Sequence, residues 1–333
     1  MLDSEAGFEG CLQSVAEAAS HGADLVEWRL DALGANIPSD LTSRSPLPSI
    51  LTLRSVQEGG AFDGTTQELS AWIEAAAAQD PPPAWIDVEY SQWEVCDTVK
   101  GAVSQAQSQG CRVLCSSHDT AGRPTDLTRR VANMQAGPFD AVKMVWRARS
   151  LRDCIECRDL LANRDKPTIA LCMGPAGVLS RVMTCAWGGL LTFAAADASS
   201  TTASGQPTVR DLLEMYRVRS LSSATKIYGL IGDPLGESPG YAMHNRAFAA
   251  AGFDGVYLPL PVAAGWESLK ATLAVLLDES DSLIRGASVT LPHKRDALRY
   301  LEETASDILP AAQQSGAVNT LILNAEGQLI GDN

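Results

Sequence analysis

The sequence predicts an α/β protein: a parallel (β/α)8-type barrel that lacks a recognisable first strand, followed by a smaller α/β domain. Three observations predict this fold. Apolar, strand-like runs alternate with helical segments along most of the chain. Polar side chains recur where these runs end, at intervals of about 25 to 35 residues, which is the length of one strand, loop and helix. A stretch of small residues at 220–224 then precedes a second series of the same alternation.

The first domain is predicted over residues 1–222. It opens with an amphipathic helix at 10–21, and no clear strand precedes this helix because the first residues are few and acidic. Seven strands are predicted, at 23–31, 49–54, 85–90, 111–116, 141–146, 168–173 and 190–195. The helices between them are predicted at 66–78, 93–109, 126–135 and 151–163. Either the barrel is open at its first seam or the chain lacks its natural beginning.

The second domain is predicted over residues 226–333. A strand at 226–232 leads into a Gly/Pro turn, and the alternation then continues. Helices are predicted at 241–251 and 265–277, and further strands at 256–260 and 284–291. The last element is expected to be a hairpin, in which 317–324 pairs with 328–331. Because the pattern stops abruptly at Asn333, we expect this domain to be incomplete.

Composition limits the classes of function. The chain has 333 residues, a formal net charge of -14 and a pI of about 4.7, which argues against a nucleic-acid surface. Its eight cysteines are scattered, and neither a signal peptide nor a membrane-length apolar run is present, so we expect a cytoplasmic protein. Cys154 and Cys157 form a CxxC pair with no second pair to complete a zinc site, and no metal is expected.

One lysine is anomalous. Lys143 interrupts an apolar strand, where an amine must be either desolvated or paired with an anion. Desolvation disfavours the ammonium form and lowers the pKa, so such an amine can attack a carbonyl and form a Schiff base. A surface lysine that extends from the strand end to water is the alternative. The preceding strand ends in His118, which favours the catalytic interpretation.

Consecutive strands of a barrel are neighbours, so Lys143 and His118 are expected to face each other across a substrate-sized gap. One of them can bond a carbonyl carbon while the other moves a proton. Glu89, one strand earlier, is expected to orient His118 and to fix its tautomer. Arg29, Arg54 and Arg181 are the local cations that an anionic substrate would need in an acidic protein.

These residues resemble a known family. Residues 23 to about 210 are similar to the type I 3-dehydroquinate dehydratases, through several motifs in the family's order. The motifs are Glu27-Trp28-Arg29-Leu30-Asp31, Leu51-Thr52-Leu53-Arg54, Asp87-Val88-Glu89, Ser117-His118-Asp119, Val142-Lys143, Met173-Gly174 with Ser180-Arg181, and Gly205-Gln206.

The resemblance implies that Lys143 forms an imine with the ketone of 3-dehydroquinate. His118 would remove the adjacent C–H proton and then protonate the leaving hydroxyl, giving 3-dehydroshikimate and water. Since the iminium acts as the electron sink, no cofactor is implied for the dehydratase. The implied substrate contacts are Glu27, Arg29 and Arg54 with the hydroxyls and carboxylate, Arg181 with the carboxylate, and a lid that ends at Gln206.

Two departures from the family stand out. The family's first strand carries a substrate-contacting serine, and this sequence has no equivalent of that strand. The lid serine of the family is replaced by Thr202, which keeps the hydroxyl.

Residues 226–333 resemble the substrate-binding half of shikimate dehydrogenase. The matching motifs are Tyr228-Gly229-Leu230-Ile231-Gly232-Asp233-Pro234, Met243-His244-Asn245, Gly286-Ala287-Ser288-Val289-Thr290-Leu291-Pro292-His293-Lys294, Gly316-Ala317-Val318-Asn319-Thr320 and Gly331-Asp332-Asn333. By this resemblance Lys294 is the proton-transfer lysine, and Thr290 and Asn319 bind ring hydroxyls. Ser238 retains the first of a pair of carboxylate-binding serines.

The dehydrogenase resemblance is incomplete. The family's catalytic aspartate would lie two residues beyond Asn333, and no Gly-x-Gly-x-x-Gly follows any strand to hold NADP. We therefore expect this polypeptide to lack dehydrogenase activity, although a full-length protein would be a bifunctional shikimate-pathway enzyme. Both ends of the chain look truncated.

The leading hypothesis is thus a dehydratase joined to a partial dehydrogenase module. Its expected partners are small anions (3-dehydroquinate, 3-dehydroshikimate and shikimate), without nucleic acid or membrane, and a homodimer is left open. A catalytically idle sensor of pathway metabolites is one alternative. A Schiff-base aldolase on the same barrel is another, and it predicts no histidine base paired with Glu89.

Overall fold

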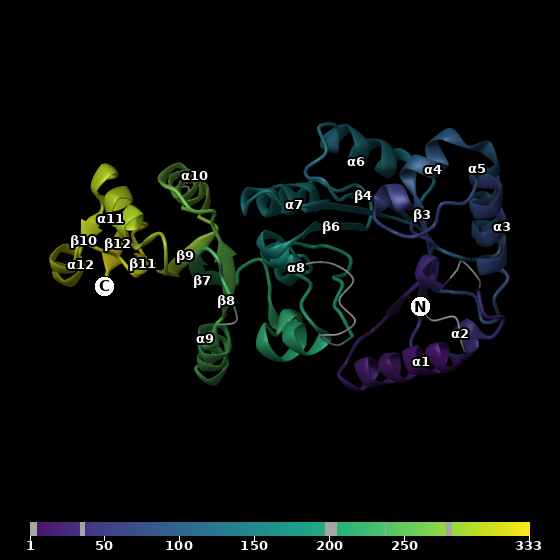
Figure 1. The fold of residues 1–333 in the computed structure, drawn as a ribbon, viewed down its shortest axis with the longest axis horizontal. Coiled ribbons are helices and arrows are strands. Elements are labelled where there is room, and N and C mark those ends of the chain that lie inside the picture. Colours follow the sequence, from purple (N-terminus) through teal and green to yellow (C-terminus); the bar gives the residue numbers. More distant parts are fainter. Residues whose placement is uncertain (1–4, 34–36, 197–204, 237, 278–281) are drawn as a thin grey trace. The chain divides into compact units, whose positions relative to one another are not determined.

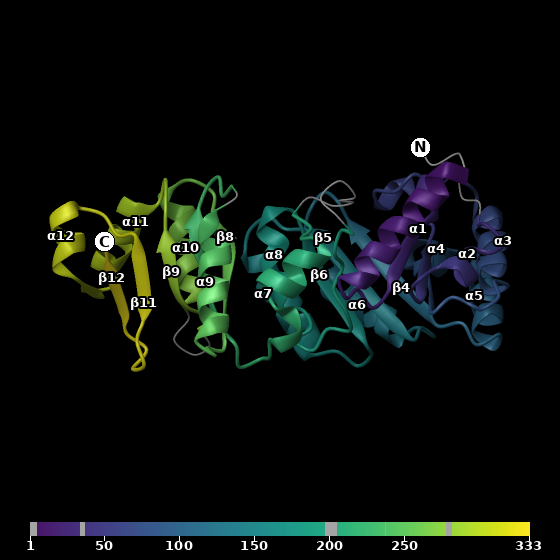
Figure 2. The same cartoon turned by 90° about the horizontal axis from the view of Figure 1, so that it is seen from below.

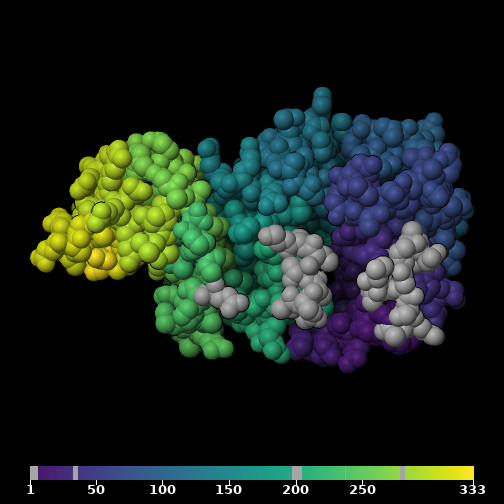
Figure 3. All heavy atoms as spheres, viewed as in Figure 1, coloured from purple at the N-terminus to yellow at the C-terminus, as the bar shows by residue number. Residues whose placement is uncertain are grey.

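The computed structural model describes residues 5–33, 37–196, 205–236, 238–277 and 282–333. Their packing divides the chain into two compact units. The first unit comprises Met1–Arg147, Leu160–Leu171 and Gly189–Thr202, and the second comprises Ala148–Asp159, Cys172–Gly188 and Ala203–Asn333. Figure 3 shows one face of the molecule with all heavy atoms drawn as spheres. No helix within the described ranges is both long enough and apolar enough to span a membrane.

A parallel sheet organises the first unit. Its six strands lie side by side in the order of the sequence, as a half-barrel (Figure 1). They are β1 (Val26–Arg29), β2 (Ser49–Thr52), β3 (Trp85–Glu89), β4 (Val113–Asp119), β5 (Ala141–Arg147) and β6 (Thr168–Met173). All residues of β2 and β3 are buried, as expected for parallel strands that are covered on both faces. The predicted class of fold is confirmed.

Helices follow the strands, as Figures 1 and 2 show. They are α1 (Glu5–Ser20), α2 (Leu41–Arg44), α3 (Thr66–Ala77), α4 (Tyr90–Val95), α5 (Asp97–Ser108), α6 (Leu127–Ala136), α7 (Arg152–Ala162) and α8 (Val178–Met183). Helix α3 begins at a capping box, in which Thr65 and Glu68 satisfy each other's backbone amides. Its buried face presents Trp72 and Ile73 to a core that also contains Ile86 of β3. This packing fixes the strands that carry the candidate site.

The register of the strands places the polar residues on one face. Glu89 of β3 pairs with Ser116 of β4, and Ser116 pairs with Lys143 of β5. Side chains two residues apart on a strand share a face, so His118 points to the same side as Lys143. The register thus agrees with a common site for these two groups, and the substrate-sized gap between them stays a prediction.

Two expected elements differ in the structure. The seventh strand, predicted at 190–195, is irregular apart from a single bridge at Ala195. The helix predicted at 93–109 is divided into α4 and α5, because the backbone of Cys96 between them is extended, with φ -129 and ψ 114. The half-barrel thus has six strands among the described residues rather than seven.

The second unit contains a mixed sheet with the strand order β10-β12-β11-β9-β7-β8. The strands are β7 (Lys226–Gly232), β8 (Gly255–Pro261), β9 (Ile284–Val289), β10 (Asp307–Ile308), β11 (Thr320–Leu323) and β12 (Leu329–Asp332). The helices are α9 (Pro239–Ala250), α10 (Trp266–Leu276), α11 (Lys294–Glu303) and α12 (Pro310–Ser315). Strands β11 and β12 form the predicted antiparallel hairpin, whereas β10 and α12 were not predicted.

The side chain of Asn245 connects α9 to β8 through hydrogen bonds. The amide nitrogen of Asn245 donates to the carbonyls of Tyr241 and Tyr257, at 2.9 and 2.8 Å. Its oxygen accepts from the amide of Tyr257 at 3.0 Å. Because Asn245 is almost completely buried, these three bonds replace water and fix the helix on the sheet.

Candidate active site

Lys143 lies on β5 with only 4% of its surface exposed. Its ammonium nitrogen Nζ lies 3.0 Å from Glu27 Oε1 and 3.3 Å from Asp87 Oδ2. Nζ also lies 4.2 Å from the ring centroid of Phe193, in a cation–π contact. Of the two environments that the sequence allowed for this amine, the structure shows the paired one. An amine that attacks a carbonyl must be deprotonated, so a nucleophilic Lys143 would first pass a proton to another group.

A buried arginine links the strands around Lys143. Nη2 of Arg54 lies 2.8 Å from Asp87 Oδ1, and Nη1 lies 3.0 Å from Glu89 Oε1 and donates to Ser116 Oγ at 2.9 Å. Burial opposes the charged guanidinium, but the carboxylates of Asp87, Glu89 and Glu58 more than offset it and raise the pKa of Arg54.

Asp87 connects this arginine to the lysine. Its Oδ1 accepts from Ser116 Oγ at 2.6 Å, while Oδ2 faces Lys143. Burial raises the pKa of Asp87, but the positive charges of Arg54 and Lys143 outweigh burial and hold the pKa below its ordinary value. Asp87 therefore remains a carboxylate at neutral pH, and one anion holds both cations in place.

The structure corrects the expected partner of His118. Nδ1 of His118 lies 3.0 Å from Glu58 Oε2, and the backbone amide of His118 donates to the same oxygen at 2.8 Å. Glu89 is instead held by Arg54 and by the amide of Ser55, and its Oε2 has no hydrogen-bond partner among the described residues. Glu89 lies on β3 in register with Ser116, two residues short of the histidine, which explains why it does not serve His118.

The loop after β2 places Glu58 beside His118. Residues Val56–Glu58 form a 3-10 turn, which Ser55 caps by accepting from the amide of Glu58. The chain then folds back at Gly59, whose φ of 85 is left-handed. A Cβ at Gly60 would collide with the carbonyl of Arg54, so only glycine permits this close return. Burial and the nearby Glu89 raise the pKa of Glu58 to about 8.

The remaining residues that the resemblance assigns to substrate binding are Arg29, Arg181, Gln206 and Thr202. Arg29 forms a two-point ion pair with Asp31, at 2.9 and 2.8 Å. Arg181 belongs to the second unit, where its Nε donates to the carbonyl of Cys172 at 3.1 Å; burial lowers its pKa. Gln206 is half-buried in an irregular segment, and Thr202 lies outside the described residues. Their roles toward a substrate remain predictions.

The candidate residues of the second unit follow strand ends and helix starts. Lys294 is the first residue of α11 and is half-buried, and Thr290 directly follows β9. Ser238 caps α9, its Oγ accepting from the amide of Gly240 at 3.2 Å. The side-chain oxygen of Asn319 accepts from Thr320 Oγ1 at 2.7 Å. Their catalytic and binding roles are likewise untested.

Sequence reasoning missed three members of the first site: Glu58, Asp87 and Ser116. Asp87 precedes Glu89 by two residues, so the two-residue period of a strand could have placed both on the same face. Glu58 gave no such signal, because it lies in a loop four residues after Arg54. No group of three or more His, Cys, Asp or Glu side chains within the described ranges could hold a metal ion.

A parallel half-barrel with a buried lysine on one strand and a histidine on the neighbouring strand defines a class, that of α/β half-barrel proteins with a polar site on one face of the sheet. Comparison with known proteins identifies the family. Residues 8–223 match the type I 3-dehydroquinase family, and residues 230–321 match the shikimate dehydrogenase substrate binding domain. The chain belongs to the type I 3-dehydroquinases and carries, after them, a shikimate dehydrogenase substrate-binding domain.

Individual relatives agree with this assignment. The chain is 35% identical over 319 residues to the chloroplastic bifunctional 3-dehydroquinate dehydratase/shikimate dehydrogenase of Arabidopsis thaliana, a match that covers 94% of this chain and 50% of the relative. It is 33% identical over 201 residues to the 3-dehydroquinate dehydratase of Dehalococcoides mccartyi, covering 60% of this chain and 87% of that one. The chain thus spans about half the length of the bifunctional relative.

A solved structure is also similar. The type I 3-dehydroquinate dehydratase from Clostridium difficile, crystallised with covalently modified comenic acid, superposes with a TM-score of 0.54 at 26% identity. The superposition covers 62% of this chain and 85% of that chain. It supports the half-barrel as the dehydratase part of the molecule.

Proposed function

We propose that the half-barrel dehydrates 3-dehydroquinate to 3-dehydroshikimate through an imine on Lys143. The observation that carries this proposal is one continuous buried network. It runs from Lys143 through Asp87 and Arg54 to Glu58 and His118, with every link between 2.8 and 3.4 Å. A network of this kind holds a nucleophile and a base at fixed positions before substrate arrives.

The first step needs the amine of Lys143. Glu27 Oε1, at 3.0 Å from Nζ, is the nearest carboxylate oxygen and would accept the ammonium proton. The freed lone pair of Nζ would then attack the ketone carbon, and loss of water from the adduct would give the iminium. Thr52 Oγ1 donates to the same oxygen of Glu27 at 2.9 Å, and this bond holds the carboxylate toward Lys143.

His118 would perform the elimination. Because Glu58 faces Nδ1, the proton transfer is assigned to Nε2. Nε2 would take the proton from the carbon next to the iminium, whose nitrogen accepts the electron pair. The resulting enamine would expel the hydroxyl, protonated by the same imidazole, and hydrolysis would restore Lys143. The net change is the loss of one water from the substrate.

Substrate binding is proposed for the remaining polar residues. Glu27, Arg29 and Arg54 would hold the hydroxyls and carboxylate, and Arg181, Thr202 and Gln206 are proposed as further substrate contacts on the family resemblance alone. In the second unit, Lys294, Thr290, Asn319 and Ser238 would bind 3-dehydroshikimate or shikimate. NADP would serve the reduction only in a longer protein, because no Gly-x-Gly-x-x-Gly in this sequence offers a phosphate cradle.

Borohydride trapping tests the dehydratase proposal. Incubation with 3-dehydroquinate and sodium borohydride should leave a reduced adduct on the peptide that contains Lys143, identified by mass mapping. Lys143→Ala should abolish this adduct, whereas Lys100→Ala, at an exposed lysine on α5, should leave it unchanged. An adduct on another lysine would refute the assignment. Retained binding of 3-dehydroquinate with no adduct at all would favour the alternative of a non-catalytic binding module.

A further inference from the structure

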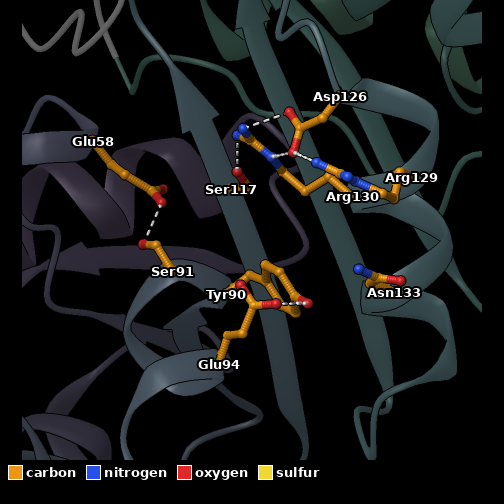
Figure 4. A pocket seen from close by; sticks show the side chains of 9 residues that line it. All are labelled: Glu58, Tyr90, Ser91, Glu94, Ser117, Asp126, Arg129, Arg130 and Asn133. Carbon is orange, nitrogen blue, oxygen red and sulfur yellow. Dashed lines mark hydrogen bonds and ion pairs between the residues drawn. The ribbon is translucent and has the colours of Figure 1, made fainter.

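A cavity lies beside the loop that carries Glu58. It has a volume of about 440 Å³ and is lined by residues of α4, α6, the end of β4 and the loop that carries Glu58. Figure 4 shows Glu58 and Ser91 on one side of it, and Ser117 with Arg130 on the other. Neither Lys143 nor His118 lines this cavity.

The two carboxylate oxygens of Glu58 serve different partners. Oε2 receives the amide of His118 and faces its Nδ1, whereas Oε1 accepts from Ser91 Oγ at 3.1 Å. Ser91 is exposed on the first turn of α4 and lines the cavity, so its hydroxyl approaches Glu58 from the side of the cavity. We propose that Ser91 is a positioning residue, which acts through Glu58 to hold a carboxylate oxygen on Nδ1 of His118. This inference rests on the proposed function, because it assigns Ser91 to the dehydratase reaction.

The charges around Glu58 explain why a neutral hydroxyl matters. Arg54 Nη1 lies 3.4 Å from Oε2, and Glu89 adds a second negative charge on β3. Burial and Glu89 favour the protonated carboxyl, whereas Arg54, the amide of His118 and the hydroxyl of Ser91 favour the carboxylate. Loss of the hydroxyl would leave the side chain of Glu58 free to turn away from His118. Nδ1 of His118 would then lose its hydrogen-bond partner.

Ser91→Ala provides the test, in the full chain. We expect kcat for 3-dehydroquinate to fall on the order of tenfold, as for other residues that orient a catalytic group, with KM changed less than about twofold. The ring nitrogens of His118, titrated by ¹⁵N NMR without substrate, should report a lower pKa than in the parent protein. Ser91→Thr, which keeps the hydroxyl, should restore both values. Asn133→Ala, at an exposed residue of the same cavity, should change neither.

The two readouts separate this inference from the proposed function. An unchanged His118 titration in Ser91→Ala, together with an unchanged kcat, would overturn the role of Ser91 while leaving the dehydratase intact. If the parent protein neither dehydrates 3-dehydroquinate nor forms an adduct, the proposed function fails. In that case a lowered His118 pKa in Ser91→Ala still supports positioning through Glu58, and an unchanged one refutes it.

Discussion

Glu58 makes the stability of the half-barrel depend on pH. Burial and the charge of Glu89 raise its pKa from 4.5 to about 8 in the folded protein. Because the folded protein holds this proton more tightly than the unfolded chain does, Glu58 contributes stability that is complete below about pH 4.5. That stability is lost as the pH rises toward 8. Integrated between pH 5 and pH 7, the loss amounts to about 2 kcal/mol.

Glu58→Gln removes the ionisable carboxyl group at this position and keeps a side chain of nearly the same shape. The amide still offers an oxygen to the His118 amide or to Ser91, and it cannot ionise. Urea unfolding followed by tryptophan fluorescence should show that the parent protein loses about 2 kcal/mol more stability than the variant between pH 5 and pH 7. Glu74→Gln, at an exposed position on α3, is the matched control and should follow the parent protein. Parallel pH curves for the parent and Glu58→Gln would refute the reasoning.

Three further predictions follow from the same geometry. His118→Ala should slow dehydration by about 10² to 10⁴-fold in a steady-state assay. Borohydride should still trap 3-dehydroquinate on Lys143 in this variant. Loss of the adduct would contradict separate roles for the two residues. Asp87→Asn should lower the free energy of unfolding by about 3 kcal/mol, because it removes the buried anion that pairs with Arg54 and Lys143. The control is Asp97→Asn, in an ion pair with Lys100 whose carboxylate is exposed, and it should lower the free energy of unfolding by less than about 0.5 kcal/mol. Asn245→Ala should destabilise the second unit by about 3 kcal/mol in calorimetry, because it leaves backbone groups of Tyr241 and Tyr257 unpaired; a change below 1 kcal/mol would contradict this.

Much of this fold could be predicted from local pattern. Buried parallel strands consist of nearly continuous apolar residues, so β2 to β6 were located within a few residues from hydrophobicity alone. The same pattern exposed Lys143 as an exception, and the order of strands in a parallel sheet placed His118 beside it. The hairpin of β11 and β12 followed from alternation around a short turn.

The carboxylate network could not be predicted in the same way. The partner of His118 depends on how the loop after β2 returns over the strand ends, and that path is set by Gly59 and Gly60 rather than by periodicity. Glu89 is the more conspicuous residue in the sequence because it ends a strand. Its place beside Arg54 was decided by the register of β3 against β2, which no local signal reveals.

The parallel sheet of the half-barrel has two edges. Within the described ranges, β1 has a strand neighbour only at β2, so one margin of the sheet lies along β1. The charged side chains of β1 are already paired, Glu27 with Lys143 and Arg29 with Asp31. Charge repulsion from these two side chains therefore does not protect this margin against pairing with another strand.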